Sequence, residues 1–357
     1  MKNKEKYIIR QYQSKILFTD RNVKTFWESE YEIPTIHPDE QSHLFSPSEC
    51  SYFSYPHSHN GNIHLFGFPY NKGTQIKDSN VKKFPSSLRL SSTRIPIYMD
   101  KEGSTTSGIF DYLAEDYLMK YCLLVDHGDI KIDNSASLND LIGITSKILN
   151  PIIGSLKTKF GVIGGDHFIT YILIKSILDK LNKKIVIFQF DAHHDCGANI
   201  LKTDKEPHHA NFVRFLLDEE KVAGIIQIGV RGLRSLGQKI EHPKLYQIPA
   251  NMMNFNLVRK ALNVIYKNNE TEDLYGYISF DVDVIDPSDF PLVDFPKTGG
   301  PKLEDIIQFI HFINEEFNEI IGFDIVEGLS EGRSDQYDPV LQVLVHILNN
   351  LTNPNRK

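Results

Sequence analysis

Short apolar runs alternate with longer amphipathic stretches over most of the chain, from about residue 63 onward. The runs are rich in Val, Ile and Phe, which is typical of strands that are buried on both faces. Turn-forming residues and helical patterns separate one run from the next. The sequence therefore predicts strands at 63–68, 121–126, 160–164, 184–190, 224–230, 275–282 and 319–326.

The stretches between these strands carry apolar residues at intervals of three and four. Leu138, Leu141, Ile142 and Leu149 illustrate the spacing, which places apolar side chains on one face of a helix. Alternating strands and helices indicate a parallel sheet with helices on both faces. The predicted fold class is thus α/β, a three-layer α/β/α sandwich with a mostly parallel sheet. Helices are predicted at 138–156, 169–181, 210–220, 256–268, 303–318 and from residue 338 onward.

The chain divides into an N-terminal extension, residues 1–61, and one α/β domain, residues 62–357. The extension is polar and aromatic, and its part from Gln41 to His59 shows no helical period, so it does not continue the alternation. It could cover an edge strand, form a contact between subunits or help to wall a binding site.

Composition and charge narrow the class of protein. The net charge is −7 and no basic block stands out, which argues against a nucleic-acid partner. Cys50, Cys122 and Cys196 share no metal-binding spacing and are typical of reduced thiols. With no apparent signal peptide or bilayer-spanning run, we expect a cytoplasmic protein without a membrane partner. A homo-oligomer is compatible with the sequence.

Candidate chemistry begins where the apolar run 185–190 ends, at Asp191-Ala192-His193-His194-Asp195. In an extended chain, alternate side chains share a side, so Asp191, His193 and Asp195 could converge while His194 points away. Carboxylates and imidazoles beside a buried strand are costly without a compensating cation. A solvated, charged loop is the alternative interpretation.

Three other strand ends carry similar groups, and they favour the metal interpretation. His167 follows the run 160–164, Asp281 and Asp283 follow another, and Glu327 follows the last. The carboxyl ends of parallel strands meet at one edge of a sheet, where α/β proteins place their chemistry. Oxygen-rich donors with two imidazoles suit Mn²⁺, and they favour a two-metal cluster over a lone zinc ion.

The four segments, in this order, resemble the metal-binding signature of the ureohydrolase superfamily, which includes arginase, agmatinase and formiminoglutamase. Residues 65–73 resemble the first strand and loop of that family, and Pro85 to Arg89 its Pro-x-x-x-Arg turn. Residues 125–129 and 228–232 are similar to two later strand ends. The resemblance implies that residues 62–357 form an arginase-like catalytic domain, a binuclear manganese hydrolase that cleaves a guanidino group to urea and an amine.

The same resemblance implies a role for each candidate ligand. It implies two Mn²⁺ per chain, held by four carboxylates and two imidazoles. Asp166 and Asp286 would orient the surroundings and not bind metal. The implied bridging ligands are Asp191 and Asp281; the others are His167 with Asp195 at one site and His193 with Asp283 at the other.

Two further roles have candidates. The leaving amine needs a proton, and His209 lies where family members carry the histidine that supplies it, with His208 as the alternative. Glu327 matches the family glutamate that faces the substrate cation.

The sequence departs from the family at two loops. Gly328 to Arg333 replaces an Asn-Pro segment, and residues 196–204 lack the Ser-Gly-Asn pattern with which arginases hold the α-carboxylate. Both departures favour a substrate whose α-groups are masked, namely arginine within a peptide, converted to ornithine. The alternatives are a small-molecule arginase, agmatinase or formiminoglutamase-type enzyme, or an inactive metal-binding regulatory relative. The second carboxylate pair disfavours the single-zinc deacetylases of related fold.

Overall fold

The computed structural model describes the part of the chain that bears the predicted alternation. The described residues are 44–46, 48–55, 61–74, 76–98, 106–112, 114–133, 135–153, 158–197, 205–233, 240–269, 274–317 and 319–353. Most of the predicted extension, residues 1–43, lies outside them.

A nine-stranded sheet forms the middle of the described structure. Its neighbouring strands are parallel throughout, except that β1 pairs antiparallel with β5. The predicted α/β fold class with a mostly parallel sheet is therefore confirmed. In spatial order the strands are β1 (Phe45–Ser46), β5 (Leu124–Ile130), β2 (Ile63–Phe68), β6 (Lys159–Gly164), β11 (Ile320–Val326), β10 (Leu274–Asp281), β7 (Lys184–Phe190), β8 (Val222–Val230) and β9 (Leu245–Pro249).

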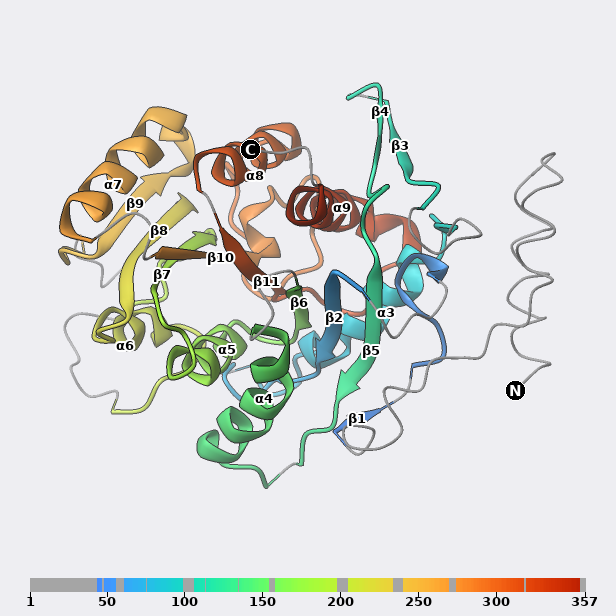
Figure 1. Cartoon of the computed structure of the whole chain (residues 1–357), viewed down its shortest axis with the longest axis horizontal. Coiled ribbons are helices and arrows are strands. Elements are labelled where there is room, and N and C mark those ends of the chain that lie inside the picture. Colours follow the sequence, from blue (N-terminus) through green and yellow to red (C-terminus); the bar gives the residue numbers. More distant parts are fainter. Residues whose placement is uncertain are drawn as a thin grey trace, which may run out of the picture.

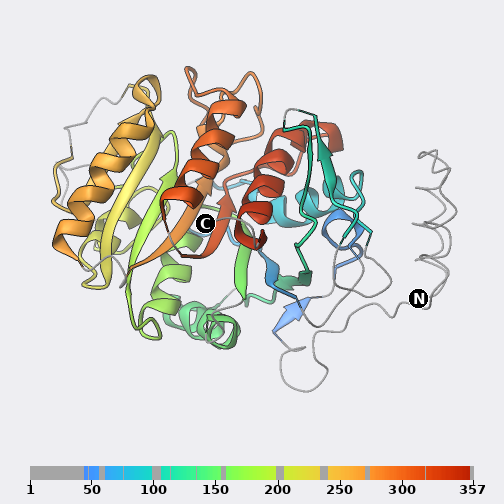
Figure 2. The same cartoon turned by 45° about the horizontal axis from the view of Figure 1, so that its top comes forward.

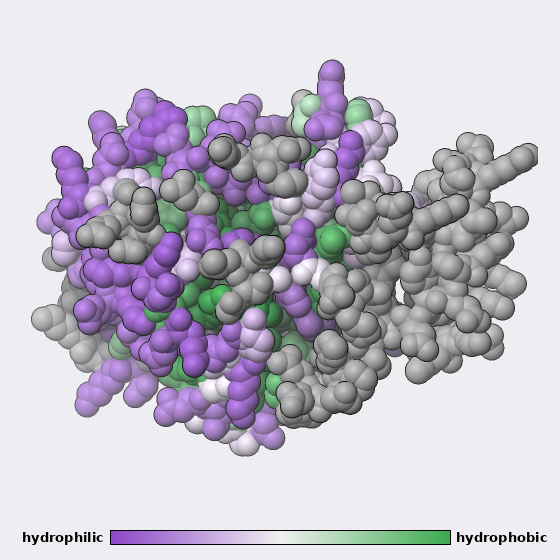
Figure 3. All heavy atoms as spheres, viewed as in Figure 1, coloured by the Kyte–Doolittle hydropathy of each residue, from purple (hydrophilic) through white to green (hydrophobic). Residues whose placement is uncertain are grey.

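Helices cover both faces of this sheet, as predicted (Figures 1 and 2). Each layer of helices closes its own apolar core against one face. The surface seen in Figure 3 is mostly hydrophilic around apolar side chains near its middle. One layer holds α4 (Leu138–Ile153), α5 (Phe168–Leu178) and α6 (Phe212–Leu217), and the other α3 (Phe84–Ser92), α7 (Phe255–Asn268), α8 (Leu303–Glu316) and α9 (Asp338–Thr352).

Smaller elements complete the described structure. A separate hairpin is formed by β3 (Ile109–Asp111) and β4 (Asp116–Leu118), and the 3-10 helices are η1 (Tyr52–Ser54), η2 (Val81–Lys83), η3 (Ala250–Met252), η5 (Val282–Val284) and η6 (Ser334–Tyr337).

None of the described helices is both long and apolar enough to span a bilayer.

Two local predictions were wrong, and both concern helix α3 and strand β5, which Arg89 links. The predicted turn from Pro85 to Arg89 is helix α3, with proline in the first turn, where its missing N–H costs nothing. Arg89 on this helix is fully buried and pairs with Asp126 at 3.0 Å and with Asp129 at 2.8 Å. Because the buried guanidinium compensates these carboxylates, β5 continues through the polar run to Ile130, beyond the predicted end at residue 126.

The described end of the extension packs on this same corner. Strand β1 pairs with the edge strand β5, and Tyr52 and Phe53 are fully buried. The guanidinium of Arg89 lies over the ring of Tyr52, with its Cζ 4.7 Å from the ring centroid. This segment therefore covers an edge strand, one of the three roles considered for it.

A histidine pair beside β1 should make the fold sensitive to acid. Burial lowers the pKa of His127 to about 4, with a contribution from His64, whose Nδ1 lies 2.8 Å from its Nε2. The ordinary value of about 6.5 holds in the unfolded chain, which therefore takes up this proton first. Stability should be complete above pH 6.5 and fall by roughly 2–3 kcal/mol as the pH drops to about 4.

The variant His127→Phe tests this expectation. Phenylalanine preserves the stacking of the ring on Phe45 but cannot take up a proton. Denaturant unfolding at pH 7 and pH 4 should show a smaller loss of stability in the variant than in the wild type. Equal losses in the two proteins would assign the acid sensitivity to other groups.

Candidate active site

The six candidate ligands and Glu327 gather at the carboxyl ends of four neighbouring strands, β6, β11, β10 and β7. These strands are not consecutive in sequence, because β10 and β11 insert between β6 and β7. The insertion brings segments separated by more than a hundred residues to one point at the centre of the sheet edge. The site therefore lies where open α/β sheets place their ligands.

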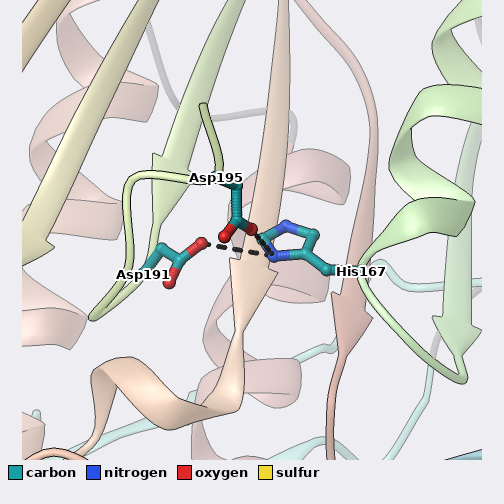
Figure 4. Close-up of side chains that lie close together, drawn as sticks. All are labelled: His167, Asp191 and Asp195. Carbon is teal, nitrogen blue, oxygen red and sulfur yellow. Dashed lines mark ion pairs between the residues drawn. The ribbon is translucent and has the colours of Figure 1, made fainter. Parts of the chain in front are cut away.

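Three carboxylates surround the imidazole of His167, and Figure 4 shows two of them. Its Nδ1 lies 3.2 Å from Asp191 Oδ2, 3.1 Å from Asp195 Oδ2 and 3.1 Å from Asp281 Oδ2. Although it is buried, this nitrogen has no hydrogen-bond partner among the described residues. One N–H could serve only one of the three oxygens, whereas a cation among the four atoms could be bound by all of them.

A second group shares one carboxylate with the first. His193 Nδ1 lies 2.7 Å from Asp283 Oδ2 and 3.7 Å from Asp191 Oδ1. In each group the potential ligand atoms lie within 4.8 Å of one another. Asp191 belongs to both groups and offers a different oxygen to each, so it could bridge two cations. The structure thus brings together all six sequence-predicted ligands.

The pKa shifts of the ligand side chains indicate that bound positive charge would stabilise the site. Burial raises the pKa of Asp191 to about 8, reinforced by Asp195 and Asp283 nearby, and burial likewise raises the pKa of Asp281. Burial alone would lower the pKa of His193, but Asp283 raises it to about 9. Neighbouring carboxylates resist a shared negative charge, and a divalent cation between them would remove that repulsion.

The chain reaches this arrangement through a bend and not through an extended strand. Strand β7 ends at Phe190, and the ligand segment after it is irregular. Asp195 has φ +43°, and Glu327, which follows β11, has φ +67°. Such conformations are uncommon for residues with side chains and concentrate at functional sites. The predicted convergence of Asp191, His193 and Asp195 is present, but the predicted alternation is not its cause.

His209 and Glu327 lie beside the ligand groups. His209 Nδ1 is 3.6 Å from Glu327 Oε1, and the same oxygen accepts a hydrogen bond from the backbone N–H of His167 at 2.7 Å. Burial alone would lower the pKa of His209, but Glu327 raises it above its ordinary value. The alternative, His208, forms a hydrogen bond within its own turn: its backbone N–H donates to Asn211 Oδ1 at 2.7 Å.

Four buried side chains behind His167 were missed by the sequence argument. Ser279 Oγ lies 3.0 Å from His167 Nε2 and donates to Asp324 Oδ1 at 2.9 Å. Thr170 and Tyr277 donate to the other oxygen of Asp324. This network fixes the ring of His167 and leaves Nδ1 directed at the carboxylates. The signal in the sequence was the polar residues within the apolar strands β10 and β11.

Three glutamines on adjacent strands were also missed. Gln189 Nε2 donates to Asp191 Oδ2 at 2.6 Å, and Gln189 Oε1 accepts from Gln227 Nε2 at 2.8 Å. Gln247 Nε2 donates in turn to Gln227 Oε1 at 2.9 Å. The row fixes which end of each amide faces the site, so an N–H always points at Asp191. A glutamine inside a buried strand is the sequence feature that could have revealed it.

The two carboxylates predicted to orient the surroundings contact backbone. Asp166 accepts from the N–H groups of Gly73 and Thr74, at 2.7 and 3.0 Å, and so holds the loop after β2. Asp286 accepts from Ser288 N at 3.0 Å and from Gly300 N at 2.8 Å. Both therefore shape loops around the site.

Comparisons with known proteins agree with this geometry. The arginase family pattern matches residues 61–331. Arginase 1, mitochondrial, of Arabidopsis thaliana is 25% identical over 210 residues, 57% of this chain and 59% of that protein. The chain thus spans less than two thirds of the plant protein's length. The agmatinase of Blochmanniella floridana is 27% identical over 278 residues, 76% of this chain and 82% of that protein.

A solved structure shares the fold. Trypanosoma cruzi formiminoglutamase, whose structure was determined with Mn²⁺, superposes with a TM-score of 0.60 at 19% identity. The superposition covers 86% of this chain and 98% of that one. At this level of identity the likeness concerns the fold alone.

Proposed function

Because the chain belongs to the arginase family, we propose that it is a binuclear manganese hydrolase that cleaves a guanidino group to urea and an amine. One observation carries the proposal. The buried Nδ1 of His167 lies among three carboxylate oxygens without a hydrogen bond among the described residues, and Asp191 links this group to His193 and Asp283. This set of oxygen and imidazole donors, without thiolate, suits two Mn²⁺ ions.

Six side chains would hold the ions. The proposed bridging ligands are Asp191 and Asp281. When bound, the ions would supply the Lewis acidity that makes water a nucleophile at neutral pH. The proposed terminal ligands are His167 and Asp195 at one site and His193 and Asp283 at the other.

The remaining steps belong to side chains of this chain. Glu327 is buried next to the ligand groups and would bind the guanidinium of the substrate through a charge-assisted pair. His209, whose pKa the same glutamate raises, would hold a proton and transfer it to the leaving amine. Burial of the site limits access of bulk water.

The finer proposal concerns the substrate. We propose an arginine-like compound, with arginine inside a peptide as the leading case and ornithine in the peptide as the product. The sequence of residues 196–204, without the pattern that grips a free α-carboxylate, supports it. Residues 198–204 lie outside the described residues. The names of the relatives, arginase and agmatinase, keep small guanidino compounds as the alternative. All three cysteines lie among the described residues and none forms a disulfide, which supports the proposed cytoplasmic location.

A panel with urea detection tests this function. Protein loaded with manganese should release urea from at least one of free arginine, agmatine and an arginine peptide blocked at both ends. Metal analysis should give about two manganese ions per chain. A preference for the blocked peptide would support the finer proposal, and a preference for free arginine or agmatine would contradict it. A single tightly held zinc ion would contradict the binuclear centre.

A further inference from the structure

An aromatic side chain lies next to the candidate proton donor. The ring of Phe295 is centred 5.9 Å from the ring of His209 and 6.3 Å from that of His193. The side chain of Phe295 contacts both histidines, and because it is 41% exposed it still presents a large apolar surface. Neither the ligand groups nor the Glu327 pair uses this ring.

The loop that carries Phe295 is fixed at several points. Lys297 O accepts from Arg231 Nη2 at 2.8 Å, and Asp294 Oδ2 accepts from Ser79 Oγ at 2.5 Å. On the inner side, Val293 forms an antiparallel bridge with Gly328, directly after Glu327. The ring is therefore held in place beside the site and does not lie on a loosely attached loop.

Chemistry determines what would lie against this ring. In the proposed reaction, which this inference takes as its basis, His209 gives its proton to the leaving nitrogen. That nitrogen carries the arm of the substrate, so the first carbons of the arm must lie beside the neighbours of His209. Phe295 is such a neighbour. We propose that Phe295 determines specificity by packing against the first carbons of the substrate arm.

The proposal narrows the substrate class. A phenyl ring is a favourable neighbour for methylene groups and offers no hydrogen bond or charge to a carboxylate. Arginine, agmatine and peptidyl arginine all place methylene groups next to the leaving nitrogen. In formiminoglutamate that nitrogen is attached to a carbon bearing a carboxylate, which would lie against the ring unpaired. The site therefore favours alkylguanidines over substrates of the formiminoglutamate type.

Binding of two simple guanidines to the manganese-loaded protein tests the proposal. Butylguanidine has an arm that reaches the ring, whereas methylguanidine has almost none. Calorimetry should show that Phe295→Ala binds butylguanidine about tenfold more weakly than the wild type does. The affinity for methylguanidine should change less than about threefold. The aliphatic variant Phe295→Leu should recover most of the affinity for butylguanidine.

A matched control is available elsewhere in the chain. Phe110 is also 41% exposed and lies on the β3–β4 hairpin, in contact with Tyr112 and Tyr117 and not with the candidate site. Phe110→Ala should bind both guanidines as the wild type does. With a substrate that releases urea, Phe295→Ala should raise KM and change kcat less than about threefold.

The outcomes separate this inference from the proposed function. If Phe295→Ala weakens the binding of both guanidines equally, or of neither, the ring does not contact the arm and the inference fails. The proposed release of urea is not affected by that result. If the selective loss is found but no panel compound yields urea, the proposed reaction fails and the contact remains. A wild-type protein that binds neither guanidine would overturn the inference.

Discussion

Replacing Asp191 with asparagine is expected to abolish urea release and the binding of the second manganese ion. Asp191 belongs to both potential ligand groups, so its loss weakens each of them, whereas His167 belongs to one. We expect a fall in turnover of more than about a thousandfold for Asp191→Asn, and a smaller fall for His167→Ala. Metal analysis after dialysis, together with a urea assay, measures both effects.

The same substitution should increase the thermal stability of the metal-free protein. Because burial raises the pKa of Asp191 to about 8, the folded state takes up this proton more readily than the unfolded state. The associated stability is complete below about pH 4 and is lost as the pH rises through 8. Metal-free Asp191→Asn should therefore melt at a higher temperature than metal-free wild type at pH 7. Added manganese should then raise the melting temperature of the wild type far more than that of the variant.

Asp286→Asn provides the control for this pair of results. This aspartate lies three residues after Asp283, and its carboxylate accepts hydrogen bonds from the backbone of its own loop. The variant should retain two manganese ions. An Asp191→Asn protein that kept both ions and its activity would refute the proposed bridging role.

The strands could be predicted from sequence because most of them are apolar along their whole length. Strands β10, β7 and β8, which are neighbours in the sheet, lie within two residues of their predicted positions. Strand β5 could not be placed as well, since its polar residues are compensated by Arg89 from a distant helix. Strand β9 ends in Pro249 and is short, so it gave no clear pattern. Such elements depend on tertiary contacts, which periodicity does not report.

The convergence of the candidate ligands could be predicted from sequence, whereas the order of the strands that bring them together could not. Each ligand follows an apolar strand, and carboxyl ends of parallel strands share one edge, so convergence could be inferred without the strand order. The order itself, with β10 and β11 inserted between β6 and β7, results from long-range packing. Polar residues inside strands, such as Gln189 and Ser279, contact the ligands from behind and were not anticipated. Their positions could have been recognised as buried polar groups, but their partners required the structure.

The substitution His209→Ala is expected to lower turnover by roughly a hundredfold or more without changing the manganese content. The imidazole is buried and lies 3.6 Å from Glu327 Oε1, outside both ligand groups. Because Glu327 raises the pKa of His209, the ring can retain a proton near neutral pH and release it to the leaving amine. Single-turnover kinetics with the best substrate of the panel, paired with metal analysis, measures this effect.

The neighbouring histidine supplies the control. His208 is of the same type and adjacent in sequence, but its backbone N–H and ring contact Asn211 and Ala210 in its own turn. His208→Ala should therefore leave the chemical step within about threefold of the wild type. If His208→Ala causes the large loss and His209→Ala does not, the proton donor has been assigned to the wrong histidine. If both variants lose manganese, the loop acts on the metal site, and the direct transfer of a proton from His209 is not supported.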